Sequence, residues 1–280
     1  MPPWYAQIPM RLGAKPKPMA YSGAFTQCAK CKKTLFKKEF VQNLFVCPYC
    51  QHHHRVTAQD RIEITFDEGS FEVLDTEVES VDTLAFPDYA EKLSGAIEKL
   101  DRNDGTLSGM ATLDGLKVAT AVADFSFMGG SMGSLAGEKV TRTLERAADN
   151  RCPAIIFCAS GGARMQEGLL SLMQMAKTTA AVERCRTVGA PYISVFTDPT
   201  MAGVLASYAS VADVILAEPR SLIGFAGTRV SKQAQVVKLP DDFQTAEWVY
   251  KHGFIDKIVA RRDMRDVLSR ISRLLMGGIR

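Results

Sequence analysis

Three segments of the chain repeat one pattern, in which an apolar run of strand length leads through a turn of small residues into a helix. The runs are residues 154–159, 192–197 and 214–217, and the turns after them begin near Gly161, Asp198 and Glu218. Short, continuous apolar runs are typical of strands buried on both faces of a parallel sheet. Their alternation with helices predicts βαβ units. We therefore expect an α/β fold whose three turns lie along one edge of the sheet, where ligands bind in open α/β folds.

The first of these turns contains the glycine pair Gly161-Gly162. A strand that ends in two glycines before a helix leaves backbone N–H groups unpaired. Because glycine has no Cβ, a substrate oxygen can approach such amides closely. The turn could hold an anion, or stabilise one that forms only in a transition state. An ordinary tight strand-to-helix turn would have the same sequence, because glycine pairs are common at turns.

A glycine-rich loop lies earlier in the chain, at residues 127–134, and leads into a helix expected over residues 137–150. It could cradle a phosphate, although it lacks the lysine of a P-loop, and the chain shows no dinucleotide fingerprint. Before the loop, Asp114-Gly115 separates two strand-like runs and predicts a hairpin. The sequence Thr57-Ala58-Gln59-Asp60 has the form of a capping box and predicts a helix N-terminus.

Four cysteines near the N-terminus form two Cys-x-x-Cys pairs, Cys28/Cys31 and Cys47/Cys50, with fifteen residues between the pairs. This spacing predicts a closed, structural zinc site with four thiolate ligands. Disulfides are the alternative, but a cytoplasmic chain disfavours them. Residues 34–36 and 44–46 are expected to be the strands of the ribbon, and His52, His53 and His54 to be exposed rather than ligating. Cys152, Cys158 and Cys185 are isolated and are expected to be buried thiols.

Charge is divided unevenly along the 280 residues. Up to Arg55 the chain carries nine Lys and Arg against one acidic residue, a net charge of +8, whereas the remainder has a net charge of −5. A basic head could meet nucleic acid, a phosphorylated cofactor or an acidic partner subunit, or it could be a solvated lysine surface. Residues 1–24 are expected to form a flexible basic tail. Neither a membrane span nor a secretory signal is predicted, so we expect the protein to be cytoplasmic.

The predicted sheet edge is poor in side chains for acid–base or nucleophilic catalysis. Three of the four histidines lie beside the cysteines, which leaves only His252 for the body of the chain, so Ser-His-Asp and Cys-His catalysis are poorly supplied. Glu167 is the one carboxylate near the first turn, and it has no evident partner. Backbone amides without a base favour a reaction whose main obstacle is an oxyanion, such as a thioester enolate, with the base supplied by the substrate or cofactor.

Several longer motifs occur in a characteristic order. The cysteine ribbon is followed by Met-Gly-Gly-Ser-Met-Gly, then Ser-Gly-Gly-Ala-Arg-Met-Gln-Glu-Gly, Asp-Pro-Thr, Ala-Glu-Pro and Leu-Ile-Gly-Phe-Ala-Gly. From Cys28 to Val259 the chain resembles the carboxyltransferase β subunits of bacterial acetyl-CoA carboxylase. The resemblance implies a zinc ribbon at residues 25–56, packed on a crotonase-like α/β domain of ββα repeats at residues 57–280.

The same resemblance implies an activity and partners. The family transfers a carboxyl group from carboxybiotin, which is held on a separate biotin carboxyl carrier protein, to acetyl-CoA, giving malonyl-CoA for fatty-acid synthesis. It works with a carboxyltransferase α subunit, and a heterotetramer of two α and two β subunits is expected here. The basic ribbon is also expected to bind nucleic acid weakly.

Site residues follow from the matching motifs. Gly161 and Gly162 would donate backbone N–H groups to the thioester oxygen of the enolate. The residues expected to shape the acyl-CoA site are Gly129, Gly130, Ala163, Arg164, Gly203, Gly224, Phe225 and Gly227, with Arg164 meeting a phosphate of CoA or making an internal ion pair.

One departure from the family pattern leaves the substrate open. The family usually has Asp-Pro-Thr-Thr-Gly-Gly where this chain has Asp-Pro-Thr followed by Met201-Ala202-Gly203. These side chains would narrow the turn, so transcarboxylation of a different small acyl-CoA remains an alternative. A nucleic-acid-binding ribbon protein is a second alternative. A stand-alone acyl-CoA hydratase or isomerase that uses Glu167 as its acid–base group is a third.

Overall fold

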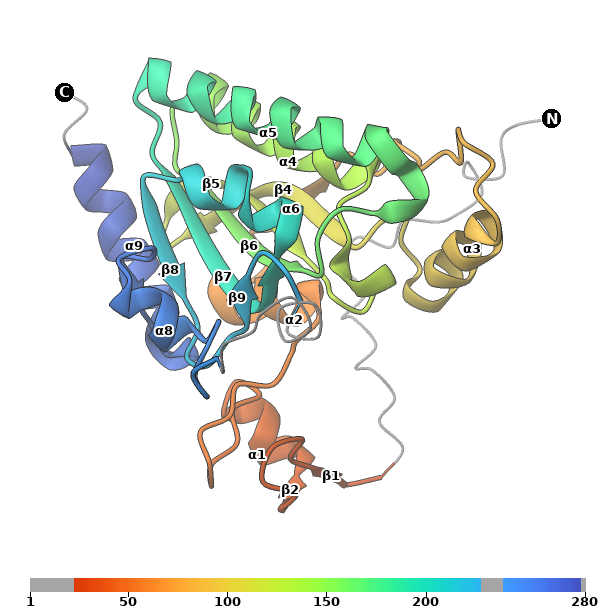
Figure 1. The fold of residues 1–280 in the computed structure, drawn as a ribbon. Coiled ribbons are helices and arrows are strands. Elements are labelled where there is room, and N and C mark those ends of the chain that lie inside the picture. The colour runs from red at the N-terminus through yellow and green to blue at the C-terminus, as the bar shows by residue number, and fades with distance from the viewer. Residues whose placement is uncertain (1–22, 228–238, 278–280) are drawn as a thin grey trace.

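An eight-stranded mixed sheet forms the centre of the protein (Figure 1). The structure is a computed structural model and describes residues 23–227 and 239–277. The strand order is β10-β8-β7-β6-β5-β4-β3, with β9 paired to the end of β7. The bounds are β3 Glu72–Leu74, β4 Thr106–Leu113, β5 Leu116–Ala123, β6 Ala154–Ser160, β7 Tyr192–Met201, β8 Val214–Ala217, β9 Ile223–Gly224 and β10 Lys257–Ile258.

The three apolar runs form neighbouring parallel strands, as their pattern predicts. Every residue of β6 is buried, and β6 pairs in parallel with β5 on one side and β7 on the other. β8 lies on the far side of β7, also in parallel. The carboxyl ends of β6, β7 and β8 therefore meet at one edge of the sheet.

The antiparallel part of the sheet comes from the predicted hairpin. β4 and β5 pair along their whole length around Asp114-Gly115. Both turn residues have positive φ, +50° at Asp114 and +79° at Gly115, which is the conformation that a two-residue hairpin turn requires. The hairpin prediction is confirmed. The hairpin reverses the chain direction between β4 and β5, so that β5 runs parallel to β6.

Two layers of helices cover the sheet. Helices α4 (Ser134–Asn150) and α5 (Gly168–Val188) lie across one face, and α2 (Ala58–Thr65) and α9 (Arg261–Gly277) lie on the other (Figure 1). The predicted capping box begins α2, where the Asp60 N–H donates to Thr57 Oγ1 at 3.1 Å. The remaining α-helices of the described body are α3 Tyr89–Leu100, α6 Ala202–Leu205 and α8 Ala246–Lys251. None of the described helices is long and apolar enough to cross a membrane.

A small N-terminal module projects from the carboxyl edge of the sheet (Figure 1). It consists of the antiparallel pair β1 (Phe25–Gln27) and β2 (Thr34–Phe36), the short helix α1 (Lys37–Gln42) and the loops that carry the cysteines. Residues 34–36 form a strand as expected. Residues 44–46 do not, because Leu44 and Phe45 have positive φ, and only Val46 forms a bridge, to His53. The expected flexible tail lies almost wholly outside the described residues.

The module is joined to the body around a buried carboxylate, Glu218. Arg61 Nη1 donates to Glu218 Oε1 at 2.7 Å, and Arg261 donates from Nε at 2.7 Å and from Nη2 at 2.6 Å. Arg261 also donates to two carbonyl oxygens of the module, those of Leu44 and His54. Burial alone would raise the pKa of Glu218, but the two guanidinium groups more than offset it and hold the pKa below its ordinary value.

Replacing this carboxylate should destabilise the protein strongly. In Glu218→Gln, two buried guanidinium groups lose their counter-charge, so the free energy of unfolding should fall by about 3–5 kcal/mol in denaturant titrations at neutral pH. The contribution of Glu218 is present above the ordinary pKa of a glutamate and is lost as the pH falls below it, so the difference between the two proteins should shrink in acid.

Glu183→Gln is the matched control, because Glu183 is an exposed partner of Arg186. Its effect should stay within about 0.5 kcal/mol. Equal effects of the two substitutions would contradict the role assigned to the buried carboxylate.

Candidate functional site

Backbone contacts bring the predicted turns together at the carboxyl edge of the sheet. The Gly161 N–H donates to the Gly129 carbonyl at 2.9 Å, and the Met132 N–H donates to the Gly162 carbonyl at 2.8 Å. The turn after β6 is thus joined to the glycine-rich loop. On the other side, β9 pairs with Thr200 and Met201 at the end of β7, which places Gly224 in the same region.

Close packing explains several glycines here. A Cβ on Gly130 would stand 2.0 Å from the Ala159 carbonyl oxygen, and a Cβ on Gly133 would stand 2.1 Å from Glu167 Oε1. Ala163 and Gly203 also face each other, because a Cβ on Gly203 would lie 3.5 Å from the Ala163 Cβ. Farther along the chain, the Phe225 side chain is exposed and Gly227 borders open space.

The two amides expected to be free donors are already engaged. The Gly161 N–H is bonded to Gly129, as described above, and the Gly162 N–H donates to Ser160 Oγ at 3.0 Å. Sequence could not reveal these acceptors, because one comes from a loop about thirty residues earlier and the other from the preceding side chain. The expectation that Gly161 and Gly162 donate to a substrate is therefore corrected: in this arrangement they stabilise the turn itself.

Two neighbouring amides are better placed. The Ala163 N–H has no acceptor among the described residues. Gly203 is the second residue of the one-turn helix α6, where N–H groups have no intrahelical acceptor. A Cβ on Gly203 would lie 3.7 Å from the Ala163 nitrogen, so the backbones of the two turns come close together here.

Ala202 makes this region narrow. Its φ is +48°, a conformation that glycine adopts at no steric cost, and its Cβ lies 2.7 Å from the position that a Cβ on Gly162 would occupy. Gly162 itself has a φ of +124°. The side chain of Ala202 therefore fills space beside Gly162 that a glycine at position 202 would leave open.

This contact predicts a measurable coupling. Gly162→Ala should lower the free energy of unfolding by about 2–4 kcal/mol, because the new methyl group meets Ala202 and the backbone conformation is unfavourable. Adding Ala202→Gly removes the steric part and should restore about 1 kcal/mol, as measured in a double-mutant cycle by denaturant unfolding.

Gly95→Ala provides the control, since Gly95 lies inside α3 with nothing within 4 Å of the new methyl group. It should leave the stability unchanged or raise it by about 1 kcal/mol. Strict additivity of Gly162→Ala and Ala202→Gly would show that the two turns do not press on each other.

Arg164 is not placed to meet a CoA phosphate. Its side chain is 1% exposed and forms ion pairs with Asp104 at 3.1 Å and with Glu167 at 3.2 Å. It also donates to the Ser131 carbonyl at 2.8 Å and so links the glycine-rich loop to the turn after β6. The guanidinium is held within this internal network. Of the two roles expected for Arg164, contact with a CoA phosphate or an internal ion pair, the structure therefore shows the internal ion pair. Asp104 lies sixty residues earlier in the chain and gave no local signal.

Glu167 does have partners, contrary to the sequence-based expectation. Tyr89 Oη donates to Glu167 Oε1 at 2.7 Å, and the N–H and hydroxyl of Ser134 each donate to Oε2 at 2.6 Å. Burial alone would raise the pKa of this carboxyl, but these donors and the Arg164 charge hold it below its ordinary value. Both oxygens are engaged within the chain, so the alternative of a hydratase loses its named acid–base group.

The four ribbon cysteines converge on one point. The sulfur atoms of Cys28 and Cys50 are 3.7 Å apart, those of Cys31 and Cys47 are 3.8 Å apart, and all four lie within 4.8 Å of one another. A tetrahedron with Zn–S bonds of about 2.3 Å has edges of about 3.8 Å, so these thiolates fit a zinc ion. They form no disulfides. Four sulfur ligands close the coordination sphere, and the metal therefore serves a structural purpose.

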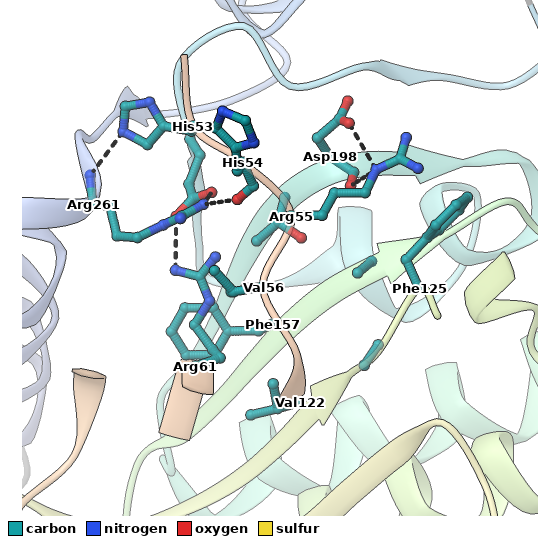
Figure 2. A pocket seen from close by; sticks show the side chains of 14 residues that line it. His53, His54, Arg55, Val56, Arg61, Val122, Phe125, Phe157, Asp198 and Arg261 are labelled. Carbon is teal, nitrogen blue, oxygen red and sulfur yellow. Dashed lines mark hydrogen bonds and ion pairs between the residues drawn. The ribbon is translucent and has the colours of Figure 1, made fainter. Parts of the chain in front are cut away.

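The histidines after the ribbon are not the exposed residues that were expected. All three are partly buried at the junction, where His53 Nε2 accepts the Arg261 backbone N–H at 3.2 Å (Figure 2). His54 packs edge-on against Phe40 of the ribbon. These histidines are partly buried because the ribbon meets the body at this point, and the sequence carries no local signal for that contact. The three isolated cysteines Cys152, Cys158 and Cys185 are buried, as predicted.

Solved structures with the same fold define the class of protein. The chain superposes on Transcarboxylase 12S, in a crystal structure with methylmalonyl-coenzyme A bound, with a TM-score of 0.65 and 25% identity over 79% of this chain and 40% of that one. A Pseudomonas malonate decarboxylase hetero-dimer gives a TM-score of 0.62 at 23% identity, over 78% of this chain and 86% of its own. Residues 51–276 match the carboxyl transferase domain family, and residues 25–50 match the acetyl-CoA carboxylase zinc finger domain. The crotonase-like α/β fold with a zinc ribbon is confirmed.

Closer relatives narrow the class. The chain is 48% identical over 261 residues to the acetyl-coenzyme A carboxylase carboxyl transferase subunit beta of Synechococcus sp. (strain WH7803), covering 92% of this chain and 89% of the relative. It is 51% identical over 251 residues to the subunit of the same name in Desulfitobacterium hafniense (strain Y51), covering 90% and 83%. The chain belongs to this family of carboxyl transferase β subunits, and the predicted resemblance is confirmed.

Proposed function

We propose that the chain is the β subunit that completes the carboxyltransferase of an acetyl-CoA carboxylase, forming malonyl-CoA from acetyl-CoA for fatty-acid synthesis. The observation that carries this proposal is the identity of about half of all residues to such subunits over nine-tenths of the chain, with both the ribbon and the body matched. Carboxybiotin on a separate carrier protein supplies the carboxyl group and, once that group has left, the base that takes the methyl proton.

The part played by this chain is to hold the acyl thioester and its developing charge. The Ala163 and Gly203 N–H groups would donate hydrogen bonds to the thioester oxygen as the enolate forms. The carboxylate that follows Ala163 most closely in the sequence, Glu167, is already engaged within the chain. A site that offers donors and leaves proton removal to an incoming group suits carboxyl transfer between two bound partners. The methyl of Ala202 beside Gly162 would favour a small acyl group such as acetyl.

Helix α5 offers a surface for the α subunit. Its first half has an inverted pattern, because the polar residues Ser171, Gln174 and Thr178 are buried while the apolar residues Leu169, Leu172 and Met173 are exposed. Met165, just before the helix, is also exposed. An exposed apolar stripe of this kind marks a protein interface. It begins a few residues after Ala163, so a partner seated there would border the proposed donors.

Reconstitution tests the function and this surface together. The purified chain, mixed with a carboxyltransferase α subunit, biotin and malonyl-CoA, should form acetyl-CoA at a rate that neither subunit gives alone. Leu172→Glu places a charge in the apolar stripe and should abolish both association, measured by analytical ultracentrifugation, and this activity.

Leu274→Glu, at an exposed leucine of α9, is the control and should leave both properties unchanged. Activity of the isolated chain, or full activity of Leu172→Glu, would contradict the proposal.

A second property, weak binding of nucleic acid by the ribbon, has one observation in its favour. The ribbon exposes Lys30, Lys32, Lys33 and Lys38 together with the aromatic side chains of Phe25 and Tyr49. The Lys33 ammonium lies 4.5 Å from the centre of the Tyr49 ring. Cations interleaved with exposed rings suit single strands, on which bases stack while the backbone meets the charges.

A salt titration measures this property. Binding of a single-stranded oligonucleotide should weaken steeply with salt, and Lys33→Ala should reduce the slope of log K against log salt by about 0.7. Lys99→Ala, at an exposed position of α3, is the control and should leave the slope unchanged. An identical slope for Lys33→Ala would exclude the ribbon as the contact surface.

A further inference from the structure

Arg55 is the last basic residue of the N-terminal head and lies in the extended link between the ribbon and α2. Its side chain is half-exposed at the carboxyl edge of the sheet, between Asp198 and Phe125 (Figure 2). Neither the composition of the head nor any motif distinguished it from the surrounding lysines. Its contacts do, because each of them leads to one of the turns assigned to the acyl-CoA site.

The contact with Asp198 leads to the turn around Gly224. Arg55 Nε donates to both the carbonyl oxygen and the Oδ2 of Asp198, at 3.0 Å each. The other carboxylate oxygen, Oδ1, accepts the Leu222 N–H at 3.0 Å. The Leu222 carbonyl in turn accepts the Thr200 N–H at 2.8 Å, at the start of the pairing between β7 and β9. Asp198 therefore fastens the segment after Ser221 to the end of β7, and Arg55 holds Asp198 from the ribbon side.

The contact with Phe125 leads to the other two turns. The guanidinium carbon of Arg55 lies 4.0 Å from the centre of the Phe125 ring, in a cation–π contact. That ring lies beside Gly129, since a Cβ on Gly129 would be 4.0 Å from Phe125 Cζ. The Gly129 carbonyl accepts the Gly161 N–H. One side chain from the ribbon link thus reaches the glycine-rich loop, the turn after β6 and the segment after β8 through no more than two intermediaries each.

We propose that Arg55 is a positioning residue that holds these three turns at their working separation, and that through it the zinc-bound ribbon and acyl-CoA binding are energetically coupled. The proposal rests on the function proposed above, because it takes the turns to be the acyl-CoA site. The ribbon residues on the N-terminal side of Arg55 are themselves held to the body, because Arg220 donates to the Cys50 carbonyl at 2.8 Å and Arg261 to the His54 carbonyl at 2.9 Å. Thermodynamic coupling is reciprocal, so bound acyl-CoA must also stabilise the docked ribbon.

The first test is kinetic and uses the reconstituted complex with the α subunit. Arg55→Met should raise KM for malonyl-CoA about tenfold and change kcat less than twofold. The three turns lose the side chain that connects them, while the N–H donors of Ala163 and Gly203 remain. Arg55→Lys should resemble Arg55→Met, because an ammonium cannot make the planar contact with Phe125 together with the paired bonds to Asp198. Arg184→Met is the control: Arg184 has the same 50% exposure, and its ion-pair partners among the described residues are acidic residues of α4, so KM should stay unchanged.

The second test measures the coupling between the zinc-bound ribbon and acyl-CoA binding without catalytic turnover. Zinc release from the complex to a chromogenic chelator should slow several-fold when acetyl-CoA is saturating in the wild type and in Arg184→Met. In Arg55→Met, zinc release should have the same rate with and without acetyl-CoA. Zinc content and the thermal transition of each variant, measured beforehand, show that the proteins compared are folded and loaded.

Three results would overturn the proposal. A wild-type KM in Arg55→Lys would mean that only the positive charge matters. A KM effect of Arg55→Met that disappears with S-malonyl-pantetheine, which lacks the adenosine phosphates of CoA, would identify a direct phosphate contact instead of positioning. Equal protection of zinc by acetyl-CoA in wild type and Arg55→Met would exclude the coupling. If the wild-type complex itself failed to convert malonyl-CoA, it is the proposed function that would fail, and zinc protection by acetyl-CoA would still report on the contact network.

Discussion

Everything at the carboxyl edge depends on main-chain groups that approach each other without side chains between them. The bonds from Gly161 to Gly129 and from Met132 to Gly162 bring two loops within direct contact, and Gly130 lies against the Ala159 carbonyl so closely that a methyl group would overlap it. Hydrogen bonds of this kind hold the turns at the end of β6, a strand in which every residue is buried. As a result, the N–H groups of Gly161 and Gly162 are engaged within the turn, whereas the Ala163 N–H, one residue farther along, has no acceptor among the described residues.

Much of the architecture could be predicted from patterns that are local in sequence. The runs of β6, β7 and β8, the Asp114-Gly115 hairpin, the capping box at Thr57 and the cysteine pairs each carry their own physical signal within a few residues. What could not be predicted is which partner a polar group finds across the fold. The sequence gives no sign of a partner for Glu167 because Tyr89 lies 78 residues away, and one ion-pair partner of Arg164, Asp104, lies sixty residues away.

Helix α5 shows a different limit of pattern analysis. The spacing of Leu169, Leu172 and Met173 correctly indicates a helix, but periodicity does not say whether a stripe faces the core or a partner. Here the buried side of the first half of α5 carries the polar residues Ser171, Gln174 and Thr178, and the large apolar side chains of Leu169, Leu172 and Met173 are exposed. The stripe is the surface on which the α subunit is proposed to sit, and the membership of the chain in a family of β subunits is consistent with a partner there.

The contacts around Glu218 bear on how the ribbon and the body came to be joined. One buried carboxylate faces two guanidinium groups, so these three side chains together carry a surplus of positive charge. The carbonyl oxygens of Leu44 and His54 turn their negative ends toward that surplus. At this contact the ribbon therefore contributes backbone dipoles and no side-chain charge, and a lineage that lost the ribbon would be expected to lose one of the two arginines as well or to cover the exposed cation with water.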